Sequence, residues 1–138
     1  MEISEVNPDG NVYQLKDSTA RAGLAQIAAQ NTYSTTEVDT GKKWTNGKTI
    51  YRKVFSGTYT VTAGQEKVII PNSSIGNVEN VISVQGYHSP TSTRNTFIPN
   101  FNTALFWDSA GTNAGIGIVS DSARNNVPVV IWYEYTKA

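Results

Sequence analysis

The chain has 138 residues, a formal net charge of zero and only 16% charged residues. This length fits one domain with a short appendage, and zero net charge argues against nucleic acid or an anionic membrane surface as a main partner. The absence of cysteine excludes a disulfide framework, a thiolate zinc site and a cysteine nucleophile. The single histidine excludes a site with several imidazole ligands, and we expect neither a metal nor a cofactor. No apolar run approaches the roughly 20 residues of a membrane helix, so we expect no membrane insertion.

Residues 1–32 predict a short strand followed by a helix. Residues 7–10 read Asn-Pro-Asp-Gly, a dense turn signal, and residues 11–16 then alternate as a strand. Residues 19–30 are rich in alanine and lack proline, which predicts a helix. Asp17 or Ser18 would cap it, because a short side-chain oxygen accepts a free N–H of the first turn.

One face of this predicted helix carries an apolar stripe, spaced by four, three and four residues: Ala20, Leu24, Ile27 and Asn31. This is the a/d spacing of a coiled coil, and leucine at a with isoleucine at d favours three- or four-stranded bundles. The helix would be only about 20 Å long, too short to hold a bundle together by itself. Two interpretations stay open: the stripe packs on the protein's own sheet, or it packs on other copies of the chain.

Residues 33–138 predict a β head domain. Asn46-Gly47 separates two strand-like segments and predicts a hairpin with a type I′ turn. Residues 55–62 alternate apolar and hydroxyl side chains, as a half-buried strand does. Further strands are expected at 67–70, 78–88, 104–108, 114–120 and 127–137, with loops at 71–76 and 89–95. About eight strands with regular turns indicate an antiparallel β-sandwich or jelly roll.

Two of these strands carry more detailed signals. Gly115 and Gly117 fall on one face of their strand, which suggests close approach by another backbone or a neighbouring subunit. In the last strand the apolar side chains share one face: Val127, Val129, Ile131, Tyr133 and Tyr135. That face is expected to be buried.

Catalytic constellations are scarce, and we predict that the chain is not an enzyme. Glycosidases need two carboxylates across the scissile bond, and Asp108, Asp121 and Glu134 are candidates by type only. Nothing in the sequence places two of them together. His88 beside Ser89 is no triad signature, and a position in the core or at its rim suits it better.

Saccharide binding has better support, because sugars are held by aromatic faces together with polar side chains that bind hydroxyls. Two regions carry this mixture. The first comprises Tyr87, His88, Arg94 and Asn95. The second comprises Asn100, Asn102, Phe106, Trp107 and Asp108. Phe106 and Trp107 have opposite strand parity, so at least one of them is expected in the core. We predict all four residues of the first region as saccharide ligands, together with Asn102, Trp107 and Asp108 of the second.

Three stretches resemble tail proteins of phages that infect Gram-positive bacteria. The most specific is YSTTE at residues 33–37 followed by GKKWTNGKTIYRK at residues 41–53, a run that opens the C-terminal β domain of that family. NPDGNVYQLKDSTAR, from Asn7 onward, resembles the preceding strand and helix of the family. WYEYTK at residues 132–137 resembles its ending. Together the three stretches cover roughly a third of the chain.

The resemblance implies a homotrimeric tail fibre or baseplate receptor-binding protein at the distal tail of the virion, made in the host cytoplasm and attached to other tail proteins. It implies that the helix is a short trimeric stem, and that the head binds a cell-wall or capsular saccharide of the host. It supplies no residue-level binding motif. Two alternatives stay open: a structural tail or baseplate component without its own ligand, and a small polysaccharide-degrading enzyme.

Overall fold

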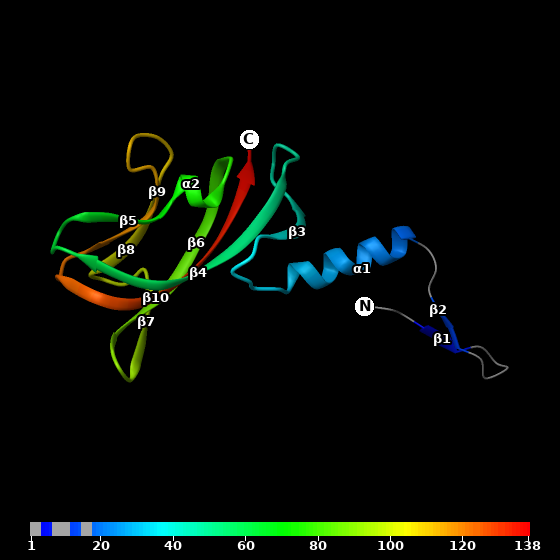
Figure 1. The fold of residues 1–138 in the computed structure, drawn as a ribbon, viewed down its shortest axis with the longest axis horizontal. Helices are drawn as coiled ribbons and strands as arrows, with labels where there is room; N and C mark the ends of the chain where they lie inside the picture. The colour runs from blue at the N-terminus through cyan, green and yellow to red at the C-terminus, as the bar shows by residue number, and fades with distance from the viewer. Residues whose placement is uncertain (1–3, 7–11, 15–17) are drawn as a thin grey trace.

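The computed structural model describes residues 4–6, 12–14 and 18–138, which form a mainly β protein with two short helices (Figure 1). The N-terminal elements are β1 (Ser4–Val6), β2 (Val12–Gln14) and α1 (Ser18–Gln30). The first part of the head comprises β3 (Val38–Lys43), β4 (Thr49–Val61), β5 (Glu66–Pro71) and α2 (Asn72–Ile75). The rest comprises β6 (Val78–Thr91), β7 (Arg94–Ile98), β8 (Thr103–Asp108), β9 (Gly115–Ser120) and β10 (Arg124–Lys137).

The predicted strand and helix of the N-terminal segment are present where the structure describes them, and a further strand, β1, precedes them. β1 and β2 pair antiparallel, with Val6 opposite Val12. Helix α1 begins at Ser18, one residue before the predicted start. The predicted turn at residues 7–10, the ends of the predicted strand at residues 11 and 15–16, and Asp17 as a cap lie outside the described residues.

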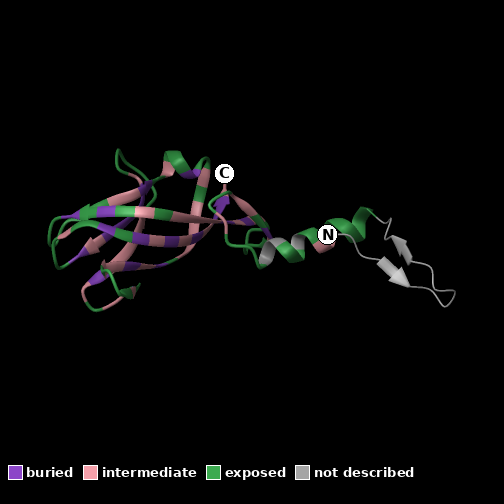
Figure 2. Ribbon diagram, turned by 60° about the horizontal axis from the view of Figure 1, so that its bottom comes forward, coloured by how far each residue is buried: buried purple, intermediate pink, exposed green. Residues whose placement is uncertain are grey.

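Helix α1 extends away from the head, and only its C-terminal end lies beside β3 (Figures 1 and 2). In the predicted stripe, Ile27 is 56% exposed, Ala20 and Asn31 are also exposed, and Leu24 is half-buried. The protein's own sheets therefore do not cover the stripe, which removes the first of the two interpretations.

The head contains eight strands in two antiparallel sheets, as the turn spacing predicted. One sheet has five strands in the order β3-β4-β10-β6-β7, and the other has three in the order β5-β9-β8. The chain passes between the sheets from β4 to β5, from β5 to β6, from β7 to β8 and from β9 to β10. Both sheets curl around a common interior, which gives a sandwich-like head (Figure 1).

The core lies between the two sheets and depends on the alternation of β10. Every predicted inward residue of this strand, from Val127 to Tyr135, is buried, with 8% exposure at most. Ile116 and Ile118 of β9 face them from the other sheet and are fully buried. A side-chain period of two places one face of such a strand in the interior, and burial of these β-branched and aromatic side chains stabilises the sandwich.

The hairpin at Asn46-Gly47 is confirmed, but its predicted type I′ turn is wrong. Trp44 N–H donates to Lys48 O at 2.9 Å, and Gly47 N–H donates to Trp44 O at 2.9 Å. Gly47 has φ of 82°, whereas Asn46 does not adopt a positive φ. The loop therefore has three residues and needs the left-handed conformation only at glycine, the form in which a tight turn is followed by a bulge.

Two predicted loops contain regular structure. Residues 89–95 were expected to form a loop, yet β6 continues to Thr91 and β7 begins at Arg94. Pro90 is tolerated in β6 because the register shifts between His88 and Thr91, where a ladder hydrogen bond is not required. The expected loop at 71–76 contains the single turn α2, whose Ile75 is buried in the core.

Candidate functional site

A polar hollow of about 450 Å³ lies on the outer face of the three-stranded sheet. Its lining comes from the edge strand β5, from β8 and from the turn that joins β8 to β9. The lining residues are Glu66, Lys67, Val68, Phe106, Asp108 and Asn113. The volume falls in the range of small-ligand sites, roughly 300–1,000 Å³.

Gly117 makes room for the Phe106 ring beside this hollow. It lies in the central strand, opposite Phe106 on one side and Val68 on the other. A Cβ atom at Gly117 would lie 2.3 Å from Cζ of Phe106 and 2.6 Å from the backbone oxygen of Lys67. The Phe106 ring therefore occupies the space that a side chain at 117 would fill. The predicted close approach at this glycine is confirmed, and it is made by β5 and Phe106 of the same chain.

The end of β8 is held in place by Asn72 of α2. The Trp107 indole Nε1–H donates to Asn72 Oδ1 at 3.2 Å, and Asn72 Nδ2 donates to the backbone oxygen of Asp108 at 3.4 Å. These bonds fix the strand end from which the Asp108 side chain projects. A binding group on a strand end that is anchored in this way is better preorganised than one on a free loop.

The polar side chains of the hollow are available to a ligand. In the described part of the chain, Glu66, Lys67, Asp108 and Asn113 have no side-chain hydrogen-bond or ion-pair partner. Two carboxylates accept hydrogen bonds, an ammonium group donates, and an amide does both. The Phe106 ring adds apolar surface beside them. Together these groups offer a ligand hydrogen-bond donors, acceptors and one apolar face.

The structure places the half-buried Trp107 against the core and away from the hollow. Its side chain points inward and packs against the core, with its indole N–H bonded to Asn72. The aromatic ring in the hollow is that of its neighbour Phe106, because successive side chains of a strand face opposite ways. Asp108, another residue predicted as a ligand, lines the hollow.

His88 is not available as a ligand-binding residue. Its side chain is buried, with 1% exposure, and it shares a hydrogen bond of 2.6 Å with the Tyr59 hydroxyl through Nδ1. Burial, together with the positive charge of Arg124, lowers the pKa of His88. The core position that we considered better suited to this histidine is the one it occupies.

Tyr87 belongs to a different surface, the outer face of the five-stranded sheet. Its ring meets that of Phe97 edge-on at a centroid distance of 6.3 Å and that of Trp132 at 6.1 Å. Phe97 is 70% exposed, and Tyr87 and Trp132 are half-buried. We call these three residues the aromatic strip.

The remaining predicted ligands lie apart from the hollow. Arg94 and Asn95 are exposed near the tip of the β6–β7 hairpin, where Asn95 Oδ1 accepts a 2.6 Å hydrogen bond from the Ser89 hydroxyl. The half-buried Asn102 belongs to the turn before β8, and its Oδ1 accepts a hydrogen bond from the Thr103 hydroxyl at 3.1 Å. Each amide oxygen is thus occupied by a local bond.

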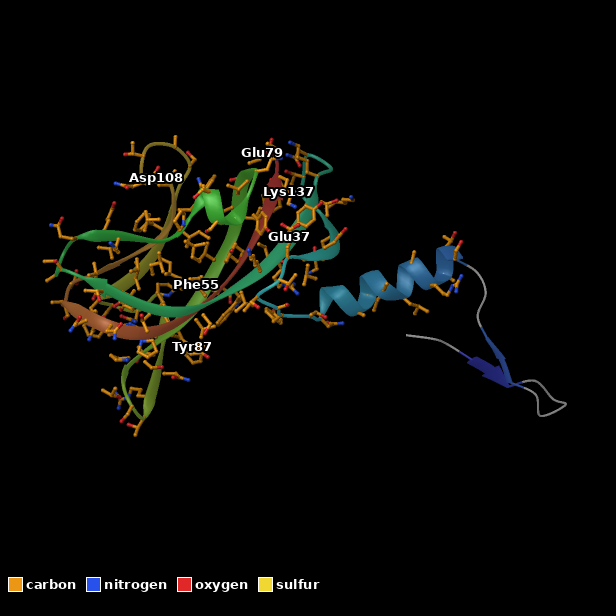
Figure 3. All side chains as sticks on the ribbon, in the orientation of Figure 1. Glu37, Phe55, Glu79, Tyr87, Asp108 and Lys137 are labelled. Atoms are coloured by element: carbon orange, nitrogen blue, oxygen red, sulfur yellow. The ribbon has the colours of Figure 1, made fainter. Side chains whose placement is uncertain are left out.

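The two predicted regions therefore do not form one site. Figure 3 labels Asp108 and Tyr87, and they lie on opposite sides of the head, on different sheets. Sequence reasoning did not select Glu66, Lys67, Phe106 and Asn113 as ligands. The signal that points to Phe106 is the side-chain-free face at Gly117, because such a face leaves space that a large side chain on a neighbouring strand can occupy.

Within the described residues, no group of three or more His, Cys, Asp and Glu side chains is gathered as a metal site would require. Nor does this part of the chain contain a helix of the length and apolarity needed to cross a membrane. Comparison with protein-family models finds no match to the chain, and comparison with curated proteins and with solved structures finds none either. The resemblance to phage tail proteins therefore rests on the sequence segments quoted for it.

Proposed function

We propose that the chain is a non-enzymatic receptor-binding domain of a phage tail, which recognises a saccharide of the host cell surface. The head would be a jelly-roll-like sandwich carried on a trimeric stem formed by α1. The observation that carries the proposal is the hollow on the three-stranded sheet. It combines an aromatic ring with unpartnered carboxylate, amide and ammonium groups at the surface of a rigid sheet.

The charge of the hollow favours a neutral sugar over an anionic one. Glu66 and Asp108 contribute two carboxylates against the single ammonium group of Lys67. A phosphate or carboxylate on the ligand would meet this negative excess, whereas hydroxyl groups would find both acceptors and donors. We therefore expect binding to depend weakly on salt, because exposed charges are screened and contribute little to a neutral ligand.

The uncovered apolar stripe of α1 supports the proposal of a trimer. The stripe from Ala20 to Asn31 is left uncovered by the head, and Ile27 exposes more than half of its side chain. An isoleucine at the d position of such a stripe is stabilised by packing against other helices. Three copies on one stem would present three hollows to the same cell surface, and valency would raise a weak monovalent affinity into strong adsorption.

The proposal is tested by binding to an array of bacterial cell-wall and capsular saccharides. We expect the wild-type chain to bind at least one neutral glycan, and the Asp108→Asn variant to bind it more weakly. Asp121→Asn is the matched control, because Asp121 is exposed and does not line the hollow. Equal binding by Asp108→Asn and wild type would contradict the placement of the site.

The enzymatic alternative gains one specific observation. Glu66 and Asp108 line the same hollow, so the structure does gather two carboxylates that the sequence could not place together. A glycosidase uses such a pair as acid and as base or nucleophile. Incubation with the bound polysaccharide distinguishes the two functions: new reducing ends that disappear in Glu66→Gln would establish hydrolysis, whereas binding without cleavage supports the receptor-binding function.

A purely structural role is the remaining alternative. The aromatic strip exposes Phe97 on the opposite face from the hollow, and such apolar surface is typical of contact with another protein. No saccharide binding by the multivalent protein, together with assembly into a larger tail complex, would favour this role.

A further inference from the structure

The connection between α1 and the head runs through residues 31–37, and it is held along its length. At the helix end, Asn31 Nδ2 donates to Ile27 O at 3.2 Å, and the Thr32 hydroxyl donates to Ala28 O at 2.9 Å. Side chains thus bond two carbonyls of the last helical turn, where a helix lacks its regular donors; the Ala28 oxygen also accepts a hydrogen bond from Asn31 N–H at 3.2 Å.

Arg52 of β4 binds this connection from the head. It is 5% exposed, and its Nη1 donates to the backbone oxygen of Thr32 at 3.2 Å. The guanidinium carbon lies 4.5 Å from the centre of the Tyr33 ring. Nη2 donates to Glu134 Oε2 at 3.2 Å, which joins the same side chain to β10. One buried arginine therefore joins the segment that directly follows the helix to strands β4 and β10.

The electrostatics of the helix end make this arginine suitable. The C-terminus of a helix carries a partial negative charge, and a cation there is stabilising. The last turn of α1 has no basic residue of its own. Arg52 supplies the positive charge from the head, and its planar fork allows it to bond a carbonyl and a carboxylate at once while stacking on an aromatic ring.

The rest of the connection is anchored to the sheet. Val54 N–H donates to Ser34 O at 2.8 Å, and Thr36 N–H donates to the Ser34 hydroxyl at 3.1 Å. Glu37 accepts a hydrogen bond from the Tyr135 hydroxyl and one of 2.5 Å from Lys137 Nζ. Figure 3 places Glu37 and Lys137 together where β3 meets the end of β10.

We propose that Arg52 is a positioning residue that fixes the direction of α1 relative to the head, so that helix and head move as one body. The geometry that carries this is the convergence of Thr32, Tyr33 and Glu134 on one buried guanidinium. If residues 33–37 were a flexible coil, their r.m.s. end-to-end distance would be roughly 12 Å, and the helix could change its position and direction relative to the head over that range. The proposal does not rest on saccharide binding, and it holds for either a receptor-binding or a structural tail protein.

Distance measurement between two spin labels tests this directly, and the cysteine-free chain allows clean labelling. One label is placed at Ala22→Cys, exposed on α1 and off the stripe, and the other at Thr62→Cys, exposed just after β4. Labelled chain is mixed with an excess of unlabelled chain, so that distances between copies do not contribute. We expect a narrow distance distribution in the protein with Arg52 intact.

The Arg52→Met variant keeps most of the buried side-chain volume but loses the charge and the donors. We expect its distance distribution to broaden, while the strand signal in circular dichroism stays unchanged. The distance distribution of Arg52→Lys should be narrower than that of Arg52→Met but broader than that of the unmodified protein, because an ammonium group cannot reproduce the planar set of donors of a guanidinium. Lys48→Met is the matched control, since it removes a cation from the exposed pair with Glu79 and should leave the distribution narrow.

Two results would overturn the proposal: a distribution in Arg52→Met that equals that of the unmodified protein, or a distribution that is already broad with Arg52 present. If Arg52→Met does not fold, Tyr33→Ala decides the question. Tyr33 is 62% exposed, so its removal should spare the head fold and broaden the distribution by loss of the stacking contact alone. An unchanged distribution in Tyr33→Ala would then count against the proposal.

Discussion

A single methyl group added at Gly117 should destabilise the head and distort the hollow. The Cβ atom of Gly117→Ala would lie 2.3 Å from Cζ of Phe106 and 2.6 Å from the Lys67 backbone oxygen. Favourable carbon contacts lie at about 3.5–4.0 Å, so the Phe106 ring must move by more than about 1 Å. The Lys67 oxygen belongs to β5, which is paired with β9, and it cannot swing aside as a side chain can.

The magnitude follows from the cost of overpacking, about 1–3 kcal/mol. For a chain of this length, 1 kcal/mol corresponds to about 3–4 °C in melting temperature. Gly117→Ala should therefore lower the midpoint of thermal unfolding by about 3–12 °C. The assay is thermal and guanidinium unfolding, followed by the strand signal in circular dichroism.

A double-mutant cycle with Phe106→Ala shows how much of the loss of stability in Gly117→Ala comes from the clash with the Phe106 ring. Without the ring, the added methyl meets only the Lys67 oxygen, so the penalty of Gly117→Ala should shrink but not vanish, with a coupling of about 0.5–3 kcal/mol. Gly23→Ala makes the same chemical change in α1 with nothing within 4 Å, and should be neutral or stabilising by up to about 1 kcal/mol. Wild-type stability in Gly117→Ala, or the same penalty with and without the Phe106 ring, would refute the packing described for the hollow.

Three further outcomes are expected. The pKa of His88 is lowered, so the unfolded chain binds more protons than the folded one. The free energy of unfolding should therefore fall as pH drops below the unfolded pKa of about 6.5. Urea unfolding at pH 7.5 and 5.5 should show this loss, and His88→Asn should reduce it. Glu37→Ala leaves the buried Tyr135 hydroxyl without its acceptor and should cost about 1–3 kcal/mol in denaturant unfolding. The loss should exceed that of Asp121→Ala, which removes an exposed carboxylate without a side-chain partner in the described residues; equal losses would contradict this. Ile27→Asp should convert the proposed trimer to monomers, measured by light scattering. Ala22→Asp, at an exposed position off the stripe, should not. A wild-type chain that is already monomeric at micromolar concentration would contradict the proposal of a trimeric stem.

The Glu37 carboxyl gives stability a second dependence on pH, at the acidic end of the range. Burial raises the pKa of Glu37, but the hydrogen bonds from Lys137 and Tyr135 outweigh it, so that the pKa is lowered overall. The stability that this carboxylate contributes is present above its unfolded value of 4.5 and is lost as pH falls through the lower folded value. This loss begins at a lower pH than that of His88, because the unfolded values are 4.5 and 6.5.

The strand pattern was predictable where one face of a strand is fully buried. Alternation in β10 has a period of two, and a core on one side enforces it from Val127 to Tyr135. The hairpin at Gly47 was predictable because glycine adopts the left-handed conformation without a steric cost. Its turn type was not, because whether one or two residues adopt positive φ depends on the pairing of Trp44 with Lys48.

The hollow could be predicted only in part. Because neighbouring residues of a strand face opposite ways, the sequence shows that Phe106 and Trp107 lie on different faces of β8. Which of the two faces the core depends on where the second sheet packs, and the strand sequence does not specify this. The meeting of Glu66 with Asp108 requires β5 and β8 to flank β9, and no local pattern specifies this order. His88 reaches its partner Tyr59 across 29 residues of sequence, so its burial was suggested by residue type and its contact was not.

The claim that the hollow binds the saccharide is tested most directly by comparing Phe106→Ala with Phe97→Ala. The first removes the ring of the hollow, and the second removes an exposed ring of the aromatic strip on the other sheet. Aromatic contacts contribute about 0.5–1.5 kcal/mol, so calorimetric titration with the glycan should show a monovalent affinity about 2- to 13-fold weaker in Phe106→Ala. Phe97→Ala should bind as the wild type does. Full affinity in Phe106→Ala with loss in Phe97→Ala would contradict the account and move the site to the aromatic strip.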